Sequence, residues 1–166
     1  MREMEVFLKE YWYATRSIGR LMLDLAAARH AYEQSCESLP CSNGYLRTGG
    51  RRTTAHSPVE RAAVIAVDHF RAEVESIERR LADERHTIAQ IEKTVREAKL
   101  TAPEAGYVRL RYFEGRSVEA AAQRLYCSVA TCGRMRVSAL GKIERTQRAM
   151  SDAYAYAAHE NRARRA

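Results

Sequence analysis

The sequence has few of the residues, and none of the short motifs, that mark several common fold and function classes. Among its 166 residues are only 3 Pro and 3 Phe, and the alternating apolar pattern of strands is nearly absent. It contains no Gly-rich phosphate loop, no H-E-x-x-H and no G-x-S-x-G motif, and its 5 His are dispersed. We therefore expect an all-α protein that is not an enzyme and holds no cofactor.

Signals for export and for membrane insertion are also missing. Charged residues interrupt the first apolar run, MREMEVFLKEYW, and no stretch approaches the roughly 18 apolar residues that a membrane span requires. We expect a cytoplasmic protein without membrane contact, whose 4 Cys are reduced. No C-x-x-C pair occurs, so we expect no metal site, although Cys36 and Cys41 lie near His30 and His56 in the sequence.

Positive charge is present, and it is concentrated in the last third of the chain. Residues 101–166 contain 12 Lys and Arg against 6 Asp and Glu, a net charge of +6, whereas residues 1–100 contain 16 against 15, a net charge of +1. A basic region of this kind is typical of proteins with a polyanionic partner, most often nucleic acid, because neutralised phosphates release counterions. Solubility alone explains such a charge equally well.

Two long segments carry an apolar residue every 3.5 positions on average, the period of helices that coil around each other. The pattern predicts helices of about 30 and about 40 residues, paired as an antiparallel coiled-coil hairpin over residues 1–100. Such a hairpin exposes the edge of its seam, which favours a homodimer through the coiled coil. The predicted seam is Met4, Leu8, Tyr11, Thr15, Ile18, Met22, Leu25, Arg29 and Tyr32 in the first helix, and Ala63, Val67, Phe70, Val74, Ile77, Leu81, Glu84, Ile88, Ile91, Val95 and Ala98 in the second.

A segment rich in Ser, Gly and Arg, at about residues 34–57, separates the two helices. It has no apolar periodicity and ends in Ser57-Pro58, which suits an N-cap followed by Pro at the first helical position. Arg47, Arg51 and Arg52 make it basic, so two roles remain open, a solvated loop and an arm that touches phosphate. The loop is the favoured interpretation.

Beyond Leu100 the sequence predicts three shorter helices and a basic tail at residues 151–166. The second and third helices are separated by only two or three residues, and the third is basic, which is the plan of a helix-turn-helix. Gly115 marks the end of the first helix. The expected N-caps are Thr101, Ser117 and Ser128, and the expected helices are 103–114, 117–125 and 128–150.

The segment YVRLRYFEGRSVEAAAQRLYCSVATCGRMRVSALGKI, residues 107–143, resembles region 4 of the sigma-70 family. That family has an L-R-Y-x-E-G-x-S opening, a helix ending in Leu-Gly, and a Ser-x-x-Thr-apolar run leading to Ala-Leu-x-Lys-apolar. The resemblance implies a helix-turn-helix module over residues 101–150. The matching residues are Leu110, Arg111, Tyr112, Glu114, Gly115, Ser117, Ala121, Ala122, Leu125, Ser128, Thr131, Cys132, Ala139 and Leu140.

The wider layout, a coiled-coil hairpin followed by this module, resembles small phage and prophage regulators of late genes of the ArpU and RinA type. The resemblance implies a transcription regulator that binds double-stranded DNA at the nucleoid of a bacterial host cell, with RNA polymerase as a further partner. Two alternatives remain open. One is a small terminase-like DNA-packaging subunit, and the other is a coiled-coil interaction protein that does not bind DNA.

The same resemblance makes the helix that starts at Ser128 the recognition helix. At 100° per residue, one of its faces holds Cys132, Met135, Ala139 and Ile143 and should meet the core, and the opposite face should meet DNA. Four of its residues would reach base edges or phosphate, while hydroxyl groups and helix starts would contact phosphate and two cations would add charge. The expected DNA-binding residues are Ser117, Ser128, Val129, Ala130, Thr131, Gly133, Arg134, Arg136, Val137 and Lys142.

Two departures from the family pattern concern the turn and the readout of sequence. Tyr126 replaces the turn Gly, so a left-handed backbone there would be costly and would favour a reshaped turn. Cys127 and Cys132 stand where the family has buried Ile or Val, and we expect both to be core residues in preference to a redox or metal pair. Arg134 is the single strong base-reading candidate, and one bidentate contact gives roughly 1–3 kcal/mol of discrimination. We therefore expect low sequence specificity, with selectivity from a second copy, DNA shape or RNA polymerase.

Overall fold

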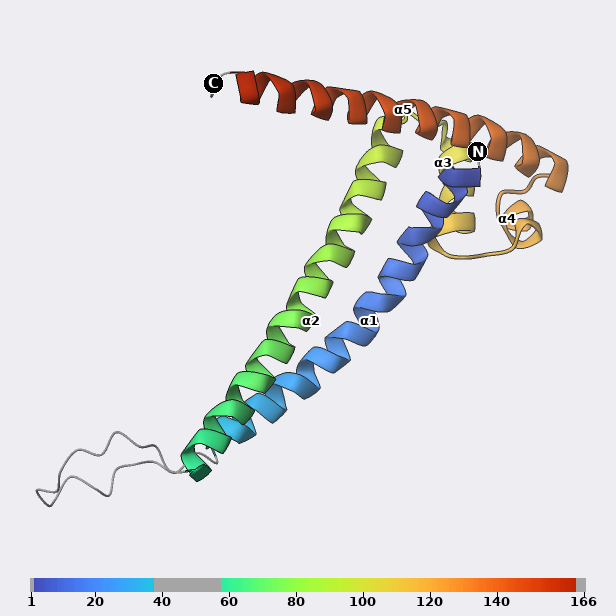
Figure 1. Cartoon of the computed structure of the whole chain (residues 1–166). Helices are drawn as coiled ribbons and strands as arrows, with labels where there is room; N and C mark the ends of the chain where they lie inside the picture. Colours follow the sequence, from blue (N-terminus) through green and yellow to red (C-terminus); the bar gives the residue numbers. More distant parts are fainter. Residues whose placement is uncertain (1, 38–57, 164–166) are drawn as a thin grey trace, which may run out of the picture. The chain divides into compact units, whose positions relative to one another are not determined.

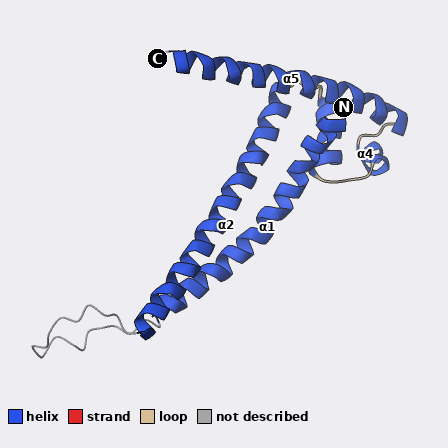
Figure 2. Cartoon of the chain, viewed as in Figure 1, coloured by secondary structure: helices blue, strands red, loops and turns tan. Residues whose placement is uncertain are grey.

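The computed structural model describes residues 2–37 and 58–163, with side chains except at positions 58–63, 66 and 157–163. Every regular element in these ranges is a helix, so the predicted all-α fold is confirmed (Figures 1 and 2). The short η1 element is a π-helical turn that continues α3. The elements are α1 (Arg2–Glu37), α2 (Pro58–Glu97), α3 (Ala102–Val108), η1 (Arg109–Phe113), α4 (Val118–Arg124) and α5 (Val129–Ala163).

The two long helices pack as a hairpin; α2 has the predicted length, whereas α1 is longer than the roughly 30 residues expected. α1 has 36 residues and α2 has 40, and α2 begins at Pro58, as expected for Pro at a first helical position. α1 continues three residues past the predicted start of the loop, to Glu37, and Ser35 Oγ donates a hydrogen bond to the carbonyl of Ala31 at 2.8 Å. The basic segment with Arg47, Arg51 and Arg52 lies outside the described residues.

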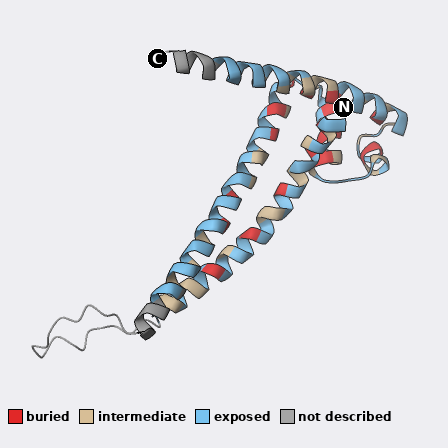
Figure 3. Cartoon of the chain, in the orientation of Figure 1, coloured by how far each residue is buried: buried red, intermediate tan, exposed pale blue. Residues whose placement is uncertain are grey.

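The chain divides into two compact units. The core unit combines Met1–Ser17 with Glu84–Ala166, and the hairpin unit is Ile18–Asp83. Both units contain parts of α1 and α2. Burial is dense in the first and sparse in the second (Figure 3).

The predicted seam of α1 is correct along one row of side chains and wrong along the other. Met4 is buried, and Tyr11, Ile18, Leu25 and Tyr32, which follow it at intervals of seven, are half-buried. Their expected neighbours four residues on are exposed from Thr15 onward, including Met22 and Arg29. Residues three positions after each row member are buried instead. On a helix, positions i+3 and i+4 lie on either side of position i, so the sequence alone does not show which of them faces the partner helix. The buried flank is Ala14, Leu21 and Ala28.

The predicted seam of α2 is confirmed along its described length. Its buried members are Ile77, Leu81, Ile91 and Ala98, which follows the end of the helix. The remaining members are half-buried, and they include the charged Glu84. The side chain of Ala63 lies outside the described set. The half-buried members are Val67, Phe70, Val74, Glu84, Ile88 and Val95.

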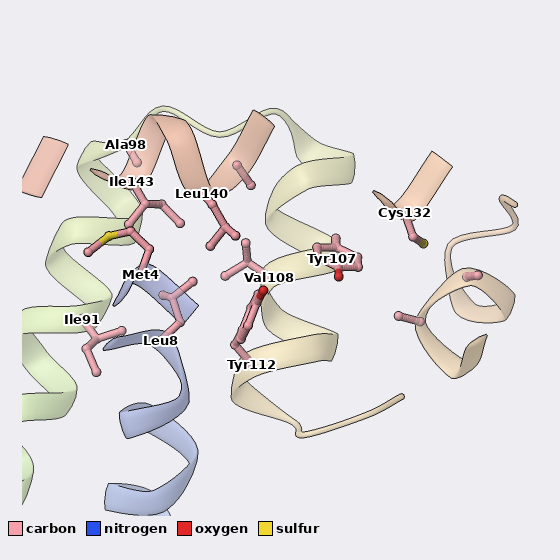
Figure 4. Packing of buried hydrophobic residues seen from close by; sticks show 13 residues of the cluster. Met4, Leu8, Ile91, Ala98, Tyr107, Val108, Tyr112, Cys132, Leu140 and Ile143 are labelled. Carbon is pink, nitrogen blue, oxygen red and sulfur yellow. The ribbon is translucent and has the colours of Figure 1, made fainter. Parts of the chain in front are cut away.

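The core unit holds one apolar cluster to which all six elements or their ends contribute. Leu140 on α5 points toward Val108 on α3, and Leu8 of α1 lies beside them (Figure 4). Tyr107 is fully buried, and Tyr112 packs edge-on against it with ring centroids 6.3 Å apart. The cluster therefore fixes α5 against the helices that precede it. Its buried members are Met4, Leu8, Ile91, Ala98, Tyr107, Val108, Tyr112, Ala121, Ala122, Cys132, Ala139, Leu140 and Ile143.

The helix predicted at 103–114 is α-helical only as far as Val108 and then widens. The amide of Glu114 donates to the carbonyl of Arg109 at 2.9 Å, an i to i−5 bond of the π type. This period brings Tyr107 and Tyr112, five residues apart, onto the same core face. Gly115 ends the turn at φ +69°, and a Cβ there would lie 2.7 Å from Trp12 Nε1, so both the backbone and the indole require glycine.

Candidate nucleic-acid interface

α4 and α5 are joined by the four-residue turn Leu125–Ser128, whose backbone bonds form a Schellman motif. The amide of Cys127 donates to the carbonyl of Ala122 at 3.1 Å, and the amide of Tyr126 donates to the carbonyl of Gln123 at 3.2 Å. Tyr126 takes φ +53°, so the position does require a left-handed backbone. The motif keeps its standard bonds, and the expected reshaping does not occur. The ring of Tyr126 is 97% exposed and meets no steric obstacle.

The first turn of α5 brings three predicted site residues together. Ser128 Oγ accepts a hydrogen bond from the amide of Thr131 at 3.1 Å, so Ser128 is the N-cap, as predicted. The hydroxyls of Ser128 and Thr131 lie 3.0 Å apart, and Arg134 Nη2 donates to Thr131 Oγ1 at 3.2 Å. These contacts direct the guanidinium of Arg134 back toward the start of α5.

The start of α4 already carries an anion. Ser117 Oγ accepts a hydrogen bond from the amide of Ala120 at 3.2 Å and is the predicted N-cap. The pKa of Glu119 is lowered by hydrogen bonds from its own backbone amide and from the Ser117 hydroxyl. A carboxylate at this position is favourable for α4 but competes with any phosphate that approaches Ser117.

The buried face predicted for α5 is confirmed, and the opposite face is exposed except at Gly141, which is half-buried. Cys132, Ala139 and Ile143 are fully buried, and Met135 is half-buried against the same cluster. On the other side, Val137 is 56% exposed and Val129 51%, and Ala130, Gly133 and Arg134 are exposed as well. We call this side the outer face of α5. Its members are Ala130, Arg134, Val137, Gly141, Arg145 and Arg148.

Two of these residues, Arg145 and Arg148, were missed by the sequence analysis. They follow Arg134 by 11 and 14 positions, close to three and four turns of helix, so the 3.6-residue period would have indicated them. Arg145 Nε donates to the carbonyl of Gly141 at 3.1 Å, and Arg148 pairs with Glu144 at 2.7 Å while its side chain stays 76% exposed. The exposed basic surface of α5 is therefore longer than the sequence motif.

The structure places the other two predicted cations in ion pairs within the core unit. The guanidinium of Arg136 contacts Glu5 of α1, which raises the pKa of Arg136, and the hydroxyl of Tyr112 donates to the same carboxylate at 3.3 Å. Lys142 Nζ donates to Glu104 Oε2 at 2.6 Å. These contacts attach α5 to α1 and α3, and neither cation lies free on the outer face.

Glu104 is the most strongly held carboxylate of the module. Its other donors are the Ser138 hydroxyl at 2.6 Å and the Thr101 amide at 2.8 Å. Burial opposes ionisation of Glu104, but the hydrogen bonds from Lys142, Ser138 and Thr101 outweigh it and hold its pKa at about 2. The Thr101 contact is the reverse half of a capping box at the start of α3.

Cys127 and Cys132 occupy the core positions that the sequence predicts. Cys132 is fully buried and Cys127 is half-buried, and their sulfur atoms lie 3.5 Å apart across the α4–α5 turn. Burial, together with the contact to the Cys127 thiol, raises the pKa of Cys132 to about 11.

The chain matches no protein-family model, no curated protein and no solved structure. Within the described ranges, no helix combines the length and apolar composition needed to cross a membrane, and no three His, Cys, Asp or Glu side chains gather as a metal ion would require.

Proposed function

We propose that the chain is a DNA-binding transcription regulator of phage or prophage origin that acts on late genes. The observation that carries the proposal is the α4–α5 pair, whose four-residue turn is fixed at both ends by caps and whose second helix exposes a basic outer face. The phage origin, the late genes and the place of action, the cytoplasm of a bacterial host cell, rest on the resemblance of residues 107–143 and of the overall layout.

The outer face has the dimensions and chemistry that a DNA groove accepts. A helix about 10–12 Å wide fits the major groove, which is about 12 Å wide. Ala130 and Val137 present small apolar groups that can contact a thymine methyl, and Gly141 allows close backbone approach. Arg134, near the start of α5, is the base-reading candidate, because its guanidinium can bind a guanine edge with two hydrogen bonds.

Affinity in this proposal comes mainly from phosphate contacts by Arg134, Arg145 and Arg148. Their guanidinium groups lie on one face, spread over about four helical turns. With a single base-reading arginine, sequence discrimination is low. A second copy, DNA shape or RNA polymerase therefore adds the selectivity that a regulator needs.

Arg136 and Lys142 have a different role in this proposal. Each is bound to a carboxylate of another element, so each holds the recognition helix in place and contributes little free charge. An alanine at either position would leave Glu5 or Glu104 without its cation. Loss of DNA binding in such a variant would therefore not distinguish a DNA contact from damage to the fold.

The decisive experiment removes charge from the outer face alone. Fluorescence anisotropy with a labelled mixed-sequence duplex of about 30 bp gives the Kd over a range of salt concentrations. For Arg134→Ala with Arg145→Ala we expect a Kd at least about tenfold higher. The slope of log Kd against log salt concentration should also fall by about two, because about two fewer counterions are released.

The matched control is Arg79→Ala with Arg80→Ala in the hairpin unit. Both residues are exposed, so the charge changes equally, and Arg79 Nε donates to the carbonyl of Glu75 as Arg145 does to Gly141. We expect its Kd to stay within about twofold of the parent. Equal losses in the two variants would show that the outer face is not the binding surface.

One observation favours the alternative of a coiled-coil interaction protein. The hairpin unit exposes large apolar side chains, with Leu23 74% exposed, Ile65 68% and Met22 54%. That alternative predicts no binding to the duplex at any salt concentration. The other alternative, a DNA-packaging subunit, predicts salt-dependent binding by an oligomer of ring size. Light scattering separates it from a regulator that is a monomer or a dimer.

A further inference from the structure

We propose that Cys127 and Cys132 form a reversible intramolecular disulfide when the protein encounters a hydroperoxide. The two sulfurs already lie 3.5 Å apart, with one thiol in the α4–α5 turn and the other at the fourth residue of α5. This modification site is independent of DNA binding, so it stands or fails separately from the function proposed above.

The geometry needs only a small movement. A disulfide brings its sulfurs to about 2.05 Å, so these two must approach each other by about 1.5 Å. Cys132 sits inside α5, where its backbone is fixed and its side chain is fully buried. Cys127 belongs to the turn, so its side chain can supply the movement by rotating.

Access from solvent differs between the two thiols. Cys127 is half-buried and lines a surface depression together with Glu119, Gln123, Tyr126 and Ser128. A small oxidant can reach Cys127 through this depression, whereas Cys132 is fully buried and does not line it. The raised pKa of Cys132 also favours its thiol form, so Cys127 reacts with the oxidant first.

The chemistry proceeds in two balanced steps. The Cys127 thiolate attacks one oxygen of hydrogen peroxide, an S–O bond forms, the O–O bond breaks and hydroxide leaves, which gives a sulfenic acid. The Cys132 sulfur then attacks the Cys127 sulfur, the S–O bond breaks, and the departing oxygen leaves as water with the Cys132 proton. Two thiols and one peroxide thus yield one disulfide and two waters, and a dithiol reductant reverses the change.

The sequence around the pair allows a direct mass-spectrometric test. Trypsin cleaves after Arg124 and Arg134, so one peptide, Leu125–Arg134, contains both cysteines. The folded full-length protein with Cys36→Ser and Cys41→Ser, which leaves only this pair, is treated with hydrogen peroxide, digested and alkylated. We expect this peptide to lose about 2 Da, the mass of two hydrogens, and to resist alkylation until dithiothreitol is added.

Two variants made in the same background separate the roles of the thiols. With Cys132→Ser we expect Cys127 to be oxidised further, to sulfinic acid, because no resolving thiol is present. With Cys127→Ser we expect Cys132 to remain a free thiol under the same treatment. Circular dichroism before treatment confirms that the variants are folded.

Three results would overturn the proposal. One is a peptide that remains fully alkylated after peroxide treatment. Another is a peptide with sulfinic acid at Cys127 beside a free Cys132. The third is a disulfide-linked dimer on a non-reducing gel in place of the internal bond. Because no DNA enters the experiment, none of these results bears on the DNA-binding proposal.

Discussion

The core unit and the hairpin unit are built from the same two long helices, yet they differ sharply in how much apolar surface is enclosed. Among the side chains that the structure describes, the core unit has thirteen buried residues in one cluster, whereas the hairpin unit has four, Leu21, Ala28, Ile77 and Leu81. In a two-helix hairpin each helix is covered on one side only, whereas α3, η1, α4 and α5 add further cover in the core unit. Helical periodicity alone thus does not determine stability.

The ion pair compared in the core unit is likewise more buried than the one compared in the hairpin unit. The Glu104–Lys142 pair of the core unit is largely buried, with side chains 8% and 27% exposed. The Arg29–Glu78 pair of the hairpin unit is open to solvent, with side chains 57% and 45% exposed. Buried pairs cost much when one partner is removed, and exposed pairs contribute little. The ion pair that holds α5 in the core unit is therefore worth more to stability than the ion pair of the hairpin unit.

The largest expected effect on the free energy of unfolding comes from replacing one buried Leu by Ala in each unit. Leu140→Ala in the core unit should destabilise by about 3–4 kcal/mol, because Leu140 is 1% exposed and its neighbours on several helices cannot close the cavity. Leu81→Ala, at a site 4% exposed between two helices only, should cost about 2 kcal/mol. Hydrogen exchange followed by mass spectrometry reports the two units separately.

The exchange pattern tests the comparison directly. In the parent, amides of α3, α4 and the first half of α5 should exchange more slowly than those of the hairpin unit. Leu81→Ala should speed exchange in the hairpin unit and leave these helices protected. Equal protection in both units, or equal losses from the two substitutions, would contradict the view that the hairpin has the weaker core.

The next effect concerns the two ion pairs. Glu104→Gln should destabilise by about 2–3 kcal/mol at pH 7, because Lys142 loses its counter-charge in a buried site. Glu78→Gln, the matched change in the exposed pair, should cost less than about 0.5 kcal/mol. Urea unfolding of the parent and the two variants gives these differences.

The contribution of Glu104 has a defined pH dependence. Its folded pKa of about 2 lies below its ordinary value of 4.5, so the unfolded state binds the proton more readily. The stabilisation is therefore fully present above about pH 4.5 and is lost as the pH falls toward 2. The difference between the parent and Glu104→Gln should shrink over this window. A difference that stays constant down to pH 2.5 would contradict the assignment.

The sequence alone predicts the local features of this molecule well. The caps Ser117 and Ser128, the start of α2 at Pro58 and the core positions of Cys127 and Cys132 all follow from short-range chemistry and helical period. The faces of α5 follow for the same reason. Each of these features depends on residues within a few positions of one another.

Features that depend on distant residues were not predictable. Arg136 meets Glu5 across 131 positions, and Lys142 meets Glu104 across 38, so no local pattern shows that these cations are already paired. The choice of Leu21 over Met22 for the α1 seam likewise depends on the surface that α2 presents. The DNA-binding role of the module is a prediction that the binding experiment must decide.

The smallest expected effect on the free energy of unfolding concerns Tyr126, in the turn between α4 and α5 of the core unit. Tyr126 holds φ +53°, a conformation that costs an L-residue roughly 1 kcal/mol and glycine very little. Because its ring is 97% exposed, its removal sacrifices almost no packing. Tyr126→Gly should therefore stabilise by about 0.5–1 kcal/mol in urea unfolding.

Two further variants separate the cost of the left-handed backbone at position 126 from the other effects of the substitution. Tyr126→Ala keeps a Cβ at the left-handed position, so it should change stability by less than about 0.3 kcal/mol. Ala72→Gly, at an exposed right-handed position in α2, should destabilise by about 1 kcal/mol. If glycine stabilises the protein at position 126 and destabilises it at position 72, the side chain strains the backbone of the turn and not that of the hairpin helix. If Tyr126→Gly instead destabilises while Tyr126→Ala does not, the strain lies elsewhere and the flexibility of the unfolded chain dominates.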